Sequence, residues 1–207
     1  MIVSLPRLYP ITDTRLSGLS HTEQVERLAA AGATLIQLRE KAASPREFYT
    51  DALSAVRAAR RLGVRVIIND RVDIALAVNA DGVHLGQDDL PVSKARLLLG
   101  GGAIIGYSTH SLKQAVEASS EPVDYIAIGP VFQTVTKENP DPVIGLEGVA
   151  EVRPRINKPL VAIGGITLDR ARSVIGAGAD SLAVISDIYR AGDIEGRVKA
   201  YLQATGN

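Results

Sequence analysis

Residues 44–70, SPREFYTDALSAVRAARRLGVRVIIND, hold a helix pattern, a turn signal and a strand pattern in immediate succession. Ser44-Pro-Arg-Glu47 has the form of a capping box, and Pro45 takes the first helical position. We expect the helix that follows to stop at Gly63. The run Arg65–Ile68 predicts a strand that is apolar on both faces, which is typical of a parallel strand covered on both sides. The stretch therefore predicts an α/β protein.

The same alternation recurs along the chain. The predicted strands are Leu8–Thr12, Thr34–Leu38, Arg65–Ile68, Gly82–Leu85, Ile104–Gly106, Tyr125–Ile128, Leu160–Ile163 and Ser181–Ile185. The predicted helices are 21–31, 45–62, 72–78, 91–99, 111–119, 148–155, 169–175 and 194–205. A period of about 25 residues over this alternation predicts an α/β fold of the (β/α)8 TIM barrel type, one compact domain over residues 1–207. The alternative is a doubly wound open sheet, but no G-x-G-x-x-G loop follows the first strand.

Composition excludes several classes of protein. The 207 residues include 23 Lys and Arg against 23 Asp and Glu, so the net charge of zero argues against nucleic acid or an anionic membrane as a partner. The absence of Cys excludes disulfides, thiolate nucleophiles and Cys-ligated metal sites. No apolar run approaches the roughly 20 residues of a membrane span, and Pro6, Arg7 and Pro10 interrupt the N-terminal apolar residues. We expect a cytoplasmic protein.

Polar residues follow nearly every predicted strand, which is where barrel enzymes place their chemistry. Gly164 and Gly165 after the seventh strand, with Ser186 after the eighth, predict a phosphate site. The alternative is that a tight turn there requires the glycines. Three cations, Arg39, Lys41 and Lys137, are expected at the same mouth, where they would either hold a diphosphate or form surface salt bridges.

Asp70 and Asp89 follow the third and fourth strands and are expected to reach one cavity. Two carboxylates without His or Cys favour Mg²⁺ over Zn²⁺. The alternative is that each aspartate caps the helix after it. His84 is either a core histidine or an acid–base group, whereas His21 is expected at the surface.

The chain from Tyr9 to about Lys199 resembles thiamine phosphate synthase in a series of motifs that fall at successive strand ends. They are Tyr9-Pro-Ile-Thr-Asp13, Gln37-Leu-Arg-Glu-Lys41, Asn69-Asp-Arg-Val-Asp73, Ala80-Asp-Gly-Val-His-Leu-Gly-Gln-Asp-Asp89, Gly106-Tyr-Ser-Thr-His110, Gly129-Pro-Val-Phe-Gln-Thr-Val-Thr-Lys137, Ala162-Ile-Gly-Gly-Ile-Thr167 and Val184-Ile-Ser186. Each motif alone is weak evidence, but their common order is specific.

The resemblance implies a transferase of thiamine biosynthesis that joins hydroxymethylpyrimidine diphosphate to thiazole phosphate and releases pyrophosphate. It implies that Asp70 and Asp89 hold Mg²⁺ and that Lys137, Ser108, Arg39 and Lys41 act on the reacting groups. Members of this family often form homodimers, so a homodimer is an assembly that the resemblance allows. The substrate-binding residues that it implies are Gln37, Leu38, Arg39, Glu40, Lys41, Asn69, His84, Ser108, Thr134, Val135, Thr136, Lys137, Gly164, Ile185 and Ser186.

The sequence leaves two alternatives to this function. The thiazole tautomerase paralogue shares several motifs, but its pattern typically lacks the aspartate after Asn69 and has His where this chain has Pro130. A non-catalytic barrel that senses a phosphorylated ligand would need neither the aspartate pair nor Lys137. Residues 138–144 form a polar, proline-containing loop, which is either a lid over the site or a loop without function.

Overall fold

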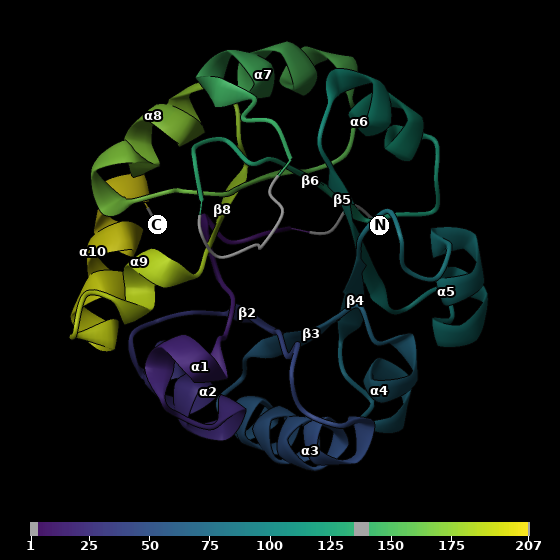
Figure 1. The fold of residues 1–207 in the computed structure, drawn as a ribbon, viewed down its shortest axis with the longest axis vertical. Coiled ribbons are helices and arrows are strands. Elements are labelled where there is room, and N and C mark those ends of the chain that lie inside the picture. The colour runs from purple at the N-terminus through teal and green to yellow at the C-terminus, as the bar shows by residue number, and fades with distance from the viewer. Residues whose placement is uncertain (1–3, 135–140, 207) are drawn as a thin grey trace.

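The computed structural model describes residues 4–134 and 141–206, and it shows a ring of strands surrounded by helices (Figure 1). The strands are β1 (Leu8–Pro10), β2 (Leu35–Leu38), β3 (Arg65–Asn69), β4 (Gly82–Leu85), β5 (Ile104–Thr109), β6 (Tyr125–Ile128), β7 (Leu160–Ile163) and β8 (Ser181–Val184). They pair in parallel in the order β1-β8-β7-β6-β5-β4-β3-β2. A bridge between Ile11 and Gln37, with the Thr12 N–H donating to the Gln37 carbonyl at 2.8 Å, joins the two end strands. The (β/α)8 barrel prediction is confirmed.

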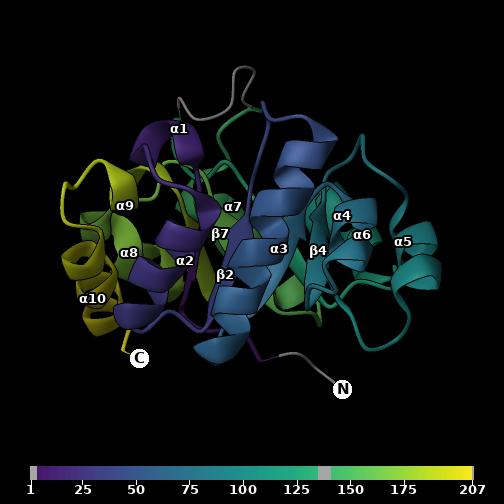
Figure 2. The same ribbon diagram turned by 90° about the horizontal axis from the view of Figure 1, so that it is seen from below.

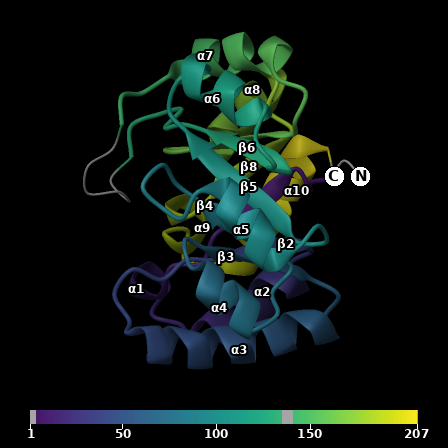
Figure 3. The same ribbon diagram turned by 90° about the vertical axis from the view of Figure 1, so that its right-hand side faces the viewer.

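The helices surround the strands on all sides (Figure 1), with α7 and α8 opposite α3 (Figure 3). They are α1 (Thr14–Ser17), α2 (His21–Ala30), α3 (Pro45–Arg61), α4 (Val72–Ala77), α5 (Val92–Leu99), α6 (Leu112–Ser119), α7 (Gly145–Val152), α8 (Ala171–Gly176), α9 (Ser186–Tyr189) and α10 (Ile194–Thr205), with 3₁₀ turns at Arg153–Arg155 and Leu168–Arg170. Both predicted capping boxes are present, at Ser20 and at Ser44. Within the described part of the chain, none of the helices combines the length and the apolar character needed to cross a membrane.

Two apolar layers follow from the alternation of side chains along each strand. Residues such as Leu8, Ile36 and Ile68 point outward and pack against the helices. The inward-facing residues, which include Tyr9, Leu35 and Ile67, fill the barrel as a second core. This inner core is closely packed and closes the barrel interior below the carboxyl ends of the strands.

Three aspartates tie neighbouring strands together at the opposite end of the barrel. Asp81, Asp124 and Asp180 each precede a strand, and their carboxylates accept the N–H groups of Val66, Ile105 and Leu160 at 2.7, 2.8 and 2.8 Å. Figure 2 shows the barrel from the side, with α1 at the end where the strands terminate. The aspartates are therefore structural, and the carboxyl ends of the strands are left for function.

Candidate active site

A cavity of about 550 Å³ opens above the inner core, at the carboxyl ends of the strands. Its lining joins residues that are far apart in the sequence, which is expected at this end of a barrel. The sequence-predicted residues that line it are Gln37, Arg39, Lys41, Asn69, Asp70, His84, Asp89, Ser108, Thr134, Gly164, Ile185 and Ser186. The structure therefore brings most of the predicted site together in one place.

Two predicted residues, Leu38 and Glu40, do not line the cavity, and three others lie outside the described residues. Leu38 is fully buried in the layer between strands and helices, so its side chain does not line the cavity. Glu40 turns its carboxylate to its own loop, as described below. Val135, Thr136 and Lys137 lie outside the described residues, and so do residues 138–140 of the loop 138–144 that was expected as a possible lid.

The two aspartates form an acidic pair at the cavity. Burial and the neighbouring charge of Asp70 both raise the pKa of the Asp89 carboxyl. Asp70 has a φ of 61°, a left-handed conformation that costs a non-glycine residue energy and is often kept at functional sites. The helix-cap alternative fails, because α4 and α5 begin after Arg71 and Pro91 and neither start has a side-chain cap. Asp89 instead accepts the Gly86 N–H at 2.6 Å.

Two cations line the same cavity as this pair. Lys41 Nζ contacts Asp70 Oδ2, and Arg39 lies 3.4 Å from Asp13. Both cations therefore form salt bridges, yet both also line the cavity. The salt-bridge role and the diphosphate-binding role expected for them are thus compatible. A substrate anion can compete with the aspartates for them.

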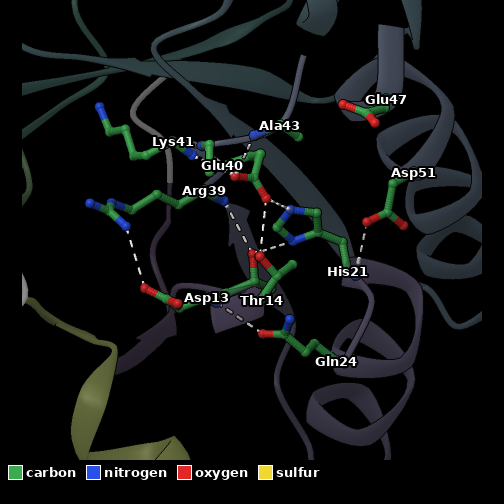
Figure 4. A network of polar contacts seen from close by, with 12 residues as sticks. Asp13, Thr14, His21, Gln24, Arg39, Glu40, Lys41, Ala43, Glu47 and Asp51 are labelled. Atoms are coloured by element: carbon green, nitrogen blue, oxygen red, sulfur yellow. Dashed lines mark hydrogen bonds and ion pairs between the residues drawn. The ribbon is translucent and has the colours of Figure 1, made fainter. Parts of the chain in front are cut away.

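The loop that carries the cations is anchored by Glu40. Its Oε1 accepts the N–H groups of Lys41, Ala42 and Ala43 at 2.8, 2.7 and 3.1 Å, and its Oε2 accepts the Thr14 hydroxyl. Figure 4 shows that Arg39 and Lys41 extend to one side of this loop while the Glu40 carboxylate turns to the other. Glu40 thus fixes the loop from which both cations project.

His21 lies behind Glu40, and the expectation that it is a surface residue is wrong. It is 1% exposed, because it begins α2 on the face that packs against the barrel. Its Nδ1 lies 2.7 Å from the Thr12 hydroxyl, which also accepts the Arg39 N–H at 3.1 Å. Burial lowers the pKa of His21, so it is a neutral support for the loop.

The glycines after β7 are compatible with both a tight turn and a phosphate site. Gly164 and Gly165 have φ angles of 99° and 64°, and a Cβ on Gly164 would lie 2.6 Å from Pro130. The tight turn therefore needs glycine, and the same turn lines the cavity. Ser186 begins α9 next to this turn, and Asp187 after it accepts the Tyr201 hydroxyl at 2.7 Å. α9 is thus held in place against α10.

A chain of buried polar groups crosses the barrel beneath the cavity. The Gln37 amide donates to the Tyr9 hydroxyl at 3.1 Å, which lies 3.0 Å from the Tyr125 hydroxyl. The Tyr125 hydroxyl lies 2.9 Å from His84 Nδ1, and His84 Nε2 lies 2.8 Å from Ser108 Oγ. Burial lowers the pKa of His84 to about 4, so the ring is neutral at physiological pH. His84 is therefore a hydrogen-bonded histidine of the cavity floor.

Sequence reasoning gave no role to Tyr9, Tyr125, Gln87 or His110, although all four line the cavity. The signal for Tyr125 is Gly106 on the adjacent strand, where a Cβ would lie 2.0 Å from the tyrosine ring. A glycine inside a strand marks such a close approach. Gln87 donates to the Ser108 carbonyl at 2.6 Å, and His110 Nδ1 lies 2.6 Å from the Gly129 carbonyl.

Comparisons with known proteins identify the family of this chain. The family model described as thiamine monophosphate synthase matches residues 8–188. Curated thiamine-phosphate synthases of Chloroflexus aurantiacus and Clostridium novyi are each 47% identical, over 91% and 93% of this chain and 87% and 95% of their own.

A solved structure extends the likeness to three dimensions. The thiamine phosphate pyrophosphorylase from Pyrococcus furiosus is 39% identical, with a TM-score of 0.88 over 97% of this chain and 95% of its own. These findings indicate a thiamine-phosphate synthase, a transferase of thiamine biosynthesis, rather than the tautomerase or the sensing barrel. The chain belongs to the thiamine monophosphate synthase family.

Proposed function

We propose that the cavity joins hydroxymethylpyrimidine diphosphate to thiazole phosphate and releases pyrophosphate. The observation that carries this proposal is the pairing of opposite charges along one wall. Lys41 contacts Asp70, and Asp89 and Arg39 line the same cavity, which is an arrangement suited to a diphosphate and its cation. Gly164, Gly165 and Ser186 supply a second, separate place for a phosphate group.

The cofactor that we propose is Mg²⁺, and the donors fit it. Asp70 and Asp89 are adjacent hard oxygen donors whose mutual repulsion a dication relieves. The described residues contain no cluster of three or more His, Cys, Asp or Glu, so water and diphosphate oxygens would complete the coordination. Bound there, Mg²⁺ would neutralise the charge that grows on the departing diphosphate.

The cations of the chain supply the remaining stabilisation. Arg39 and Lys41 are held by the Glu40-anchored loop, so they are already oriented when the diphosphate arrives. Lys137 is proposed as a third cation on the same group. Charges act more strongly inside a protein cavity than in bulk solution, because the surrounding protein lowers the effective dielectric constant.

Bond breaking precedes bond formation in the proposed mechanism. The pyrimidine CH₂–O bond breaks, its electron pair leaves with the diphosphate oxygen, and the electron-rich ring stabilises the resulting cation. The lone pair of the thiazole nitrogen then forms the new C–N bond. That nitrogen carries no proton, so no general base is needed, which agrees with the neutral, fully hydrogen-bonded His84.

The proposed positions of the two substrates follow the cavity walls. Gln37 on β2, Asn69 on β3 and Ser108 on β5 all line the cavity, and we assign them to the pyrimidine and its leaving group. Thr134, Thr136, Gly164, Ile185 and Ser186 are assigned to the thiazole phosphate. Leu38 and Val135 contribute to substrate binding, in the case of Leu38 through its backbone.

A homodimer is the assembly that we propose. Its support is the family resemblance, together with exposed leucines on neighbouring helices, Leu76 on α4 and Leu97 and Leu98 on α5. Light scattering gives the mass in solution, and a monomer would contradict the proposal. The cytoplasmic location stays a prediction, which fractionation of the source cells tests.

The order of bond breaking is tested by substituent effects. An electron-withdrawing group on the pyrimidine should lower kcat strongly, because it destabilises the cation, while binding changes little. An equal or faster rate would indicate direct displacement by the thiazole nitrogen and would contradict the proposed mechanism.

A further inference from the structure

We propose that Tyr9 and Tyr125 are positioning residues that act through His84 to make the Ser108 hydroxyl a hydrogen-bond donor into the cavity. This inference rests on the proposed function, because it assigns the Ser108 proton to an oxygen of the diphosphate. The inference assigns a positioning role to two tyrosines that contact no predicted metal ligand.

The chain of hydrogen bonds from Gln37 to Ser108 is continuous. Gln37, Tyr9, Tyr125, His84 and Ser108 are joined by four contacts of 3.1, 3.0, 2.9 and 2.8 Å. Tyr9 and Tyr125 are 1% and 0% exposed, so solvent does not compete for their hydroxyls. The His84 ring also stacks on the Tyr125 ring at 5.6 Å between centroids, which fixes its orientation.

The available protons decide which group donates and which accepts at each of these hydrogen bonds. The Gln37 amide N–H donates to the Tyr9 hydroxyl. The Tyr9 proton must then go to Tyr125, since the described residues offer the Tyr9 hydroxyl no other hydrogen-bond acceptor. Tyr125 in turn donates to His84 Nδ1, so the neutral ring carries its proton on Nε2. The opposite direction would leave the Tyr9 proton buried without an acceptor, which is costly.

The direction decides what Ser108 offers to a substrate. His84 Nε2–H donates to Ser108 Oγ, so the serine proton is free to point into the cavity. A donor there favours an anionic oxygen. With the opposite His84 tautomer, the serine proton would go to Nε2 and the serine would present only lone pairs, which repel a diphosphate.

The absence of a side chain at Gly106 leaves the space that the Tyr125 ring occupies. Gly106 lies on β5, where any Cβ would come within 2.0 Å of the Tyr125 ring. The tyrosine edge meets the Tyr9 ring at 84°, so both hydroxyls converge inside the barrel. The two tyrosines therefore occupy defined positions, with little freedom to turn away.

The experiment compares Tyr125→Phe and Tyr9→Phe with the wild type and with Tyr189→Phe. Tyr189 is a matched control, because it is buried and its hydroxyl has no partner among the described residues. Nitrogen-15 NMR of labelled histidines, assigned with His84→Asn, reports which ring nitrogen of His84 is protonated. Steady-state kinetics with both substrates are measured on the same proteins.

We expect Nε2–H in the wild type and in Tyr189→Phe, and a mixture of tautomers in the two test variants. Loss of one neutral hydrogen bond corresponds to roughly a fivefold to tenfold fall in kcat, with the KM for thiazole phosphate unchanged. Protonated Nδ1 in the wild type would overturn the inference, as would an unchanged tautomer or an unchanged kcat in Tyr125→Phe. The NMR signature needs no turnover, so an inactive wild-type protein would instead count against the proposed function.

Discussion

Asp70 stands beside Asp89 at the cavity, and its charge contributes to raising the pKa of the Asp89 carboxyl. Neither residue caps a helix, so helix capping does not account for two adjacent carboxyl groups at this place. A dication removes that repulsion, and this is the physical basis of the proposed Mg²⁺ site.

Asp70→Asn and Asp89→Asn should fold with little change in the thermal midpoint but require far more Mg²⁺ or lose activity. Asparagine keeps the shape and one oxygen but removes the charge that a hard cation prefers. The double variant should be little worse than the weaker single variant, since ligands of one metal act as a unit. The control is Asp73→Asn, an exposed ion-pair partner of Arg71 outside the cavity. Wild-type Mg²⁺ titrations in both single variants would contradict the metal assignment.

Ser186→Ala should raise the KM for thiazole phosphate by about tenfold or more and leave the KM for the pyrimidine diphosphate nearly unchanged. A hydrogen bond to a charged group contributes about 1.5–3 kcal/mol, and Ser186 is assigned only to the thiazole phosphate. The exposed Ser173 on α8 offers the matched alanine control. Equal effects on both substrates would mean that the phosphate is placed wrongly.

Gly164→Val is expected to destabilise the fold as well as weaken binding. Its Cβ would lie 2.6 Å from Pro130, and its φ of 99° disfavours any side chain. The thermal midpoint should therefore fall, whereas that of Ser186→Ala should not. A Gly164→Val protein as stable as the wild type would show that the turn has more room than the structure indicates.

Lys137→Ala should lower kcat by on the order of 10²–10³, by analogy with loss of an oxyanion-hole donor. The effect on the KM for thiazole phosphate should be smaller, since the cation acts on the departing diphosphate. Lys113→Ala is the control, because Lys113 is an exposed helix residue paired with Glu117. An unchanged kcat would return Lys137 to a surface role.

The free energy of unfolding should fall as the pH drops below about 6.5, the ordinary histidine pKa. Burial lowers the pKa of His21 in the folded protein, so on acidification the unfolded chain binds the proton first. The contribution of His21 to the free energy of unfolding is therefore complete above the pKa that histidine has in the unfolded chain. It is lost as the pH falls from that value toward the lower pKa of His21 in the folded protein, at no more than about 1.4 kcal/mol per pH unit for one histidine.

Urea titrations of the wild type and of His21→Gln test this sign. His21→Gln should be less stable at neutral pH but show a shallower decline toward acid pH. His84, whose pKa burial lowers to about 4, contributes a decline of the same sign in both proteins. Identical pH slopes for the two proteins would contradict a neutral, buried His21.

Much of the fold could be predicted because its signals are local. The strands Gly82–Leu85, Tyr125–Ile128 and Leu160–Ile163 match their predicted bounds, and the capping boxes mark the starts of α2 and α3. The short helices α1 and α9 were not predicted, since four residues are too few to show a helical period.

The site residues that follow apolar strands could be predicted. Those whose role depends on side-chain direction or on packing inside the barrel could not. Leu38 adjoins binding residues in the sequence, but strand alternation turns it outward, to the helices. Glu40 is charged like a ligand, yet its carboxylate is used by backbone N–H groups of its own loop. The link between Tyr9 and Tyr125 depends on packing across the barrel, which a linear pattern does not carry.

The most direct measurement is an assay of the purified protein with both substrates, with and without Mg²⁺, that follows thiamine phosphate and pyrophosphate together. The account predicts equal amounts of the two products, formed only when both substrates and Mg²⁺ are present. Pyrophosphate without thiamine phosphate, or no product from the complete mixture, would contradict the proposed condensation.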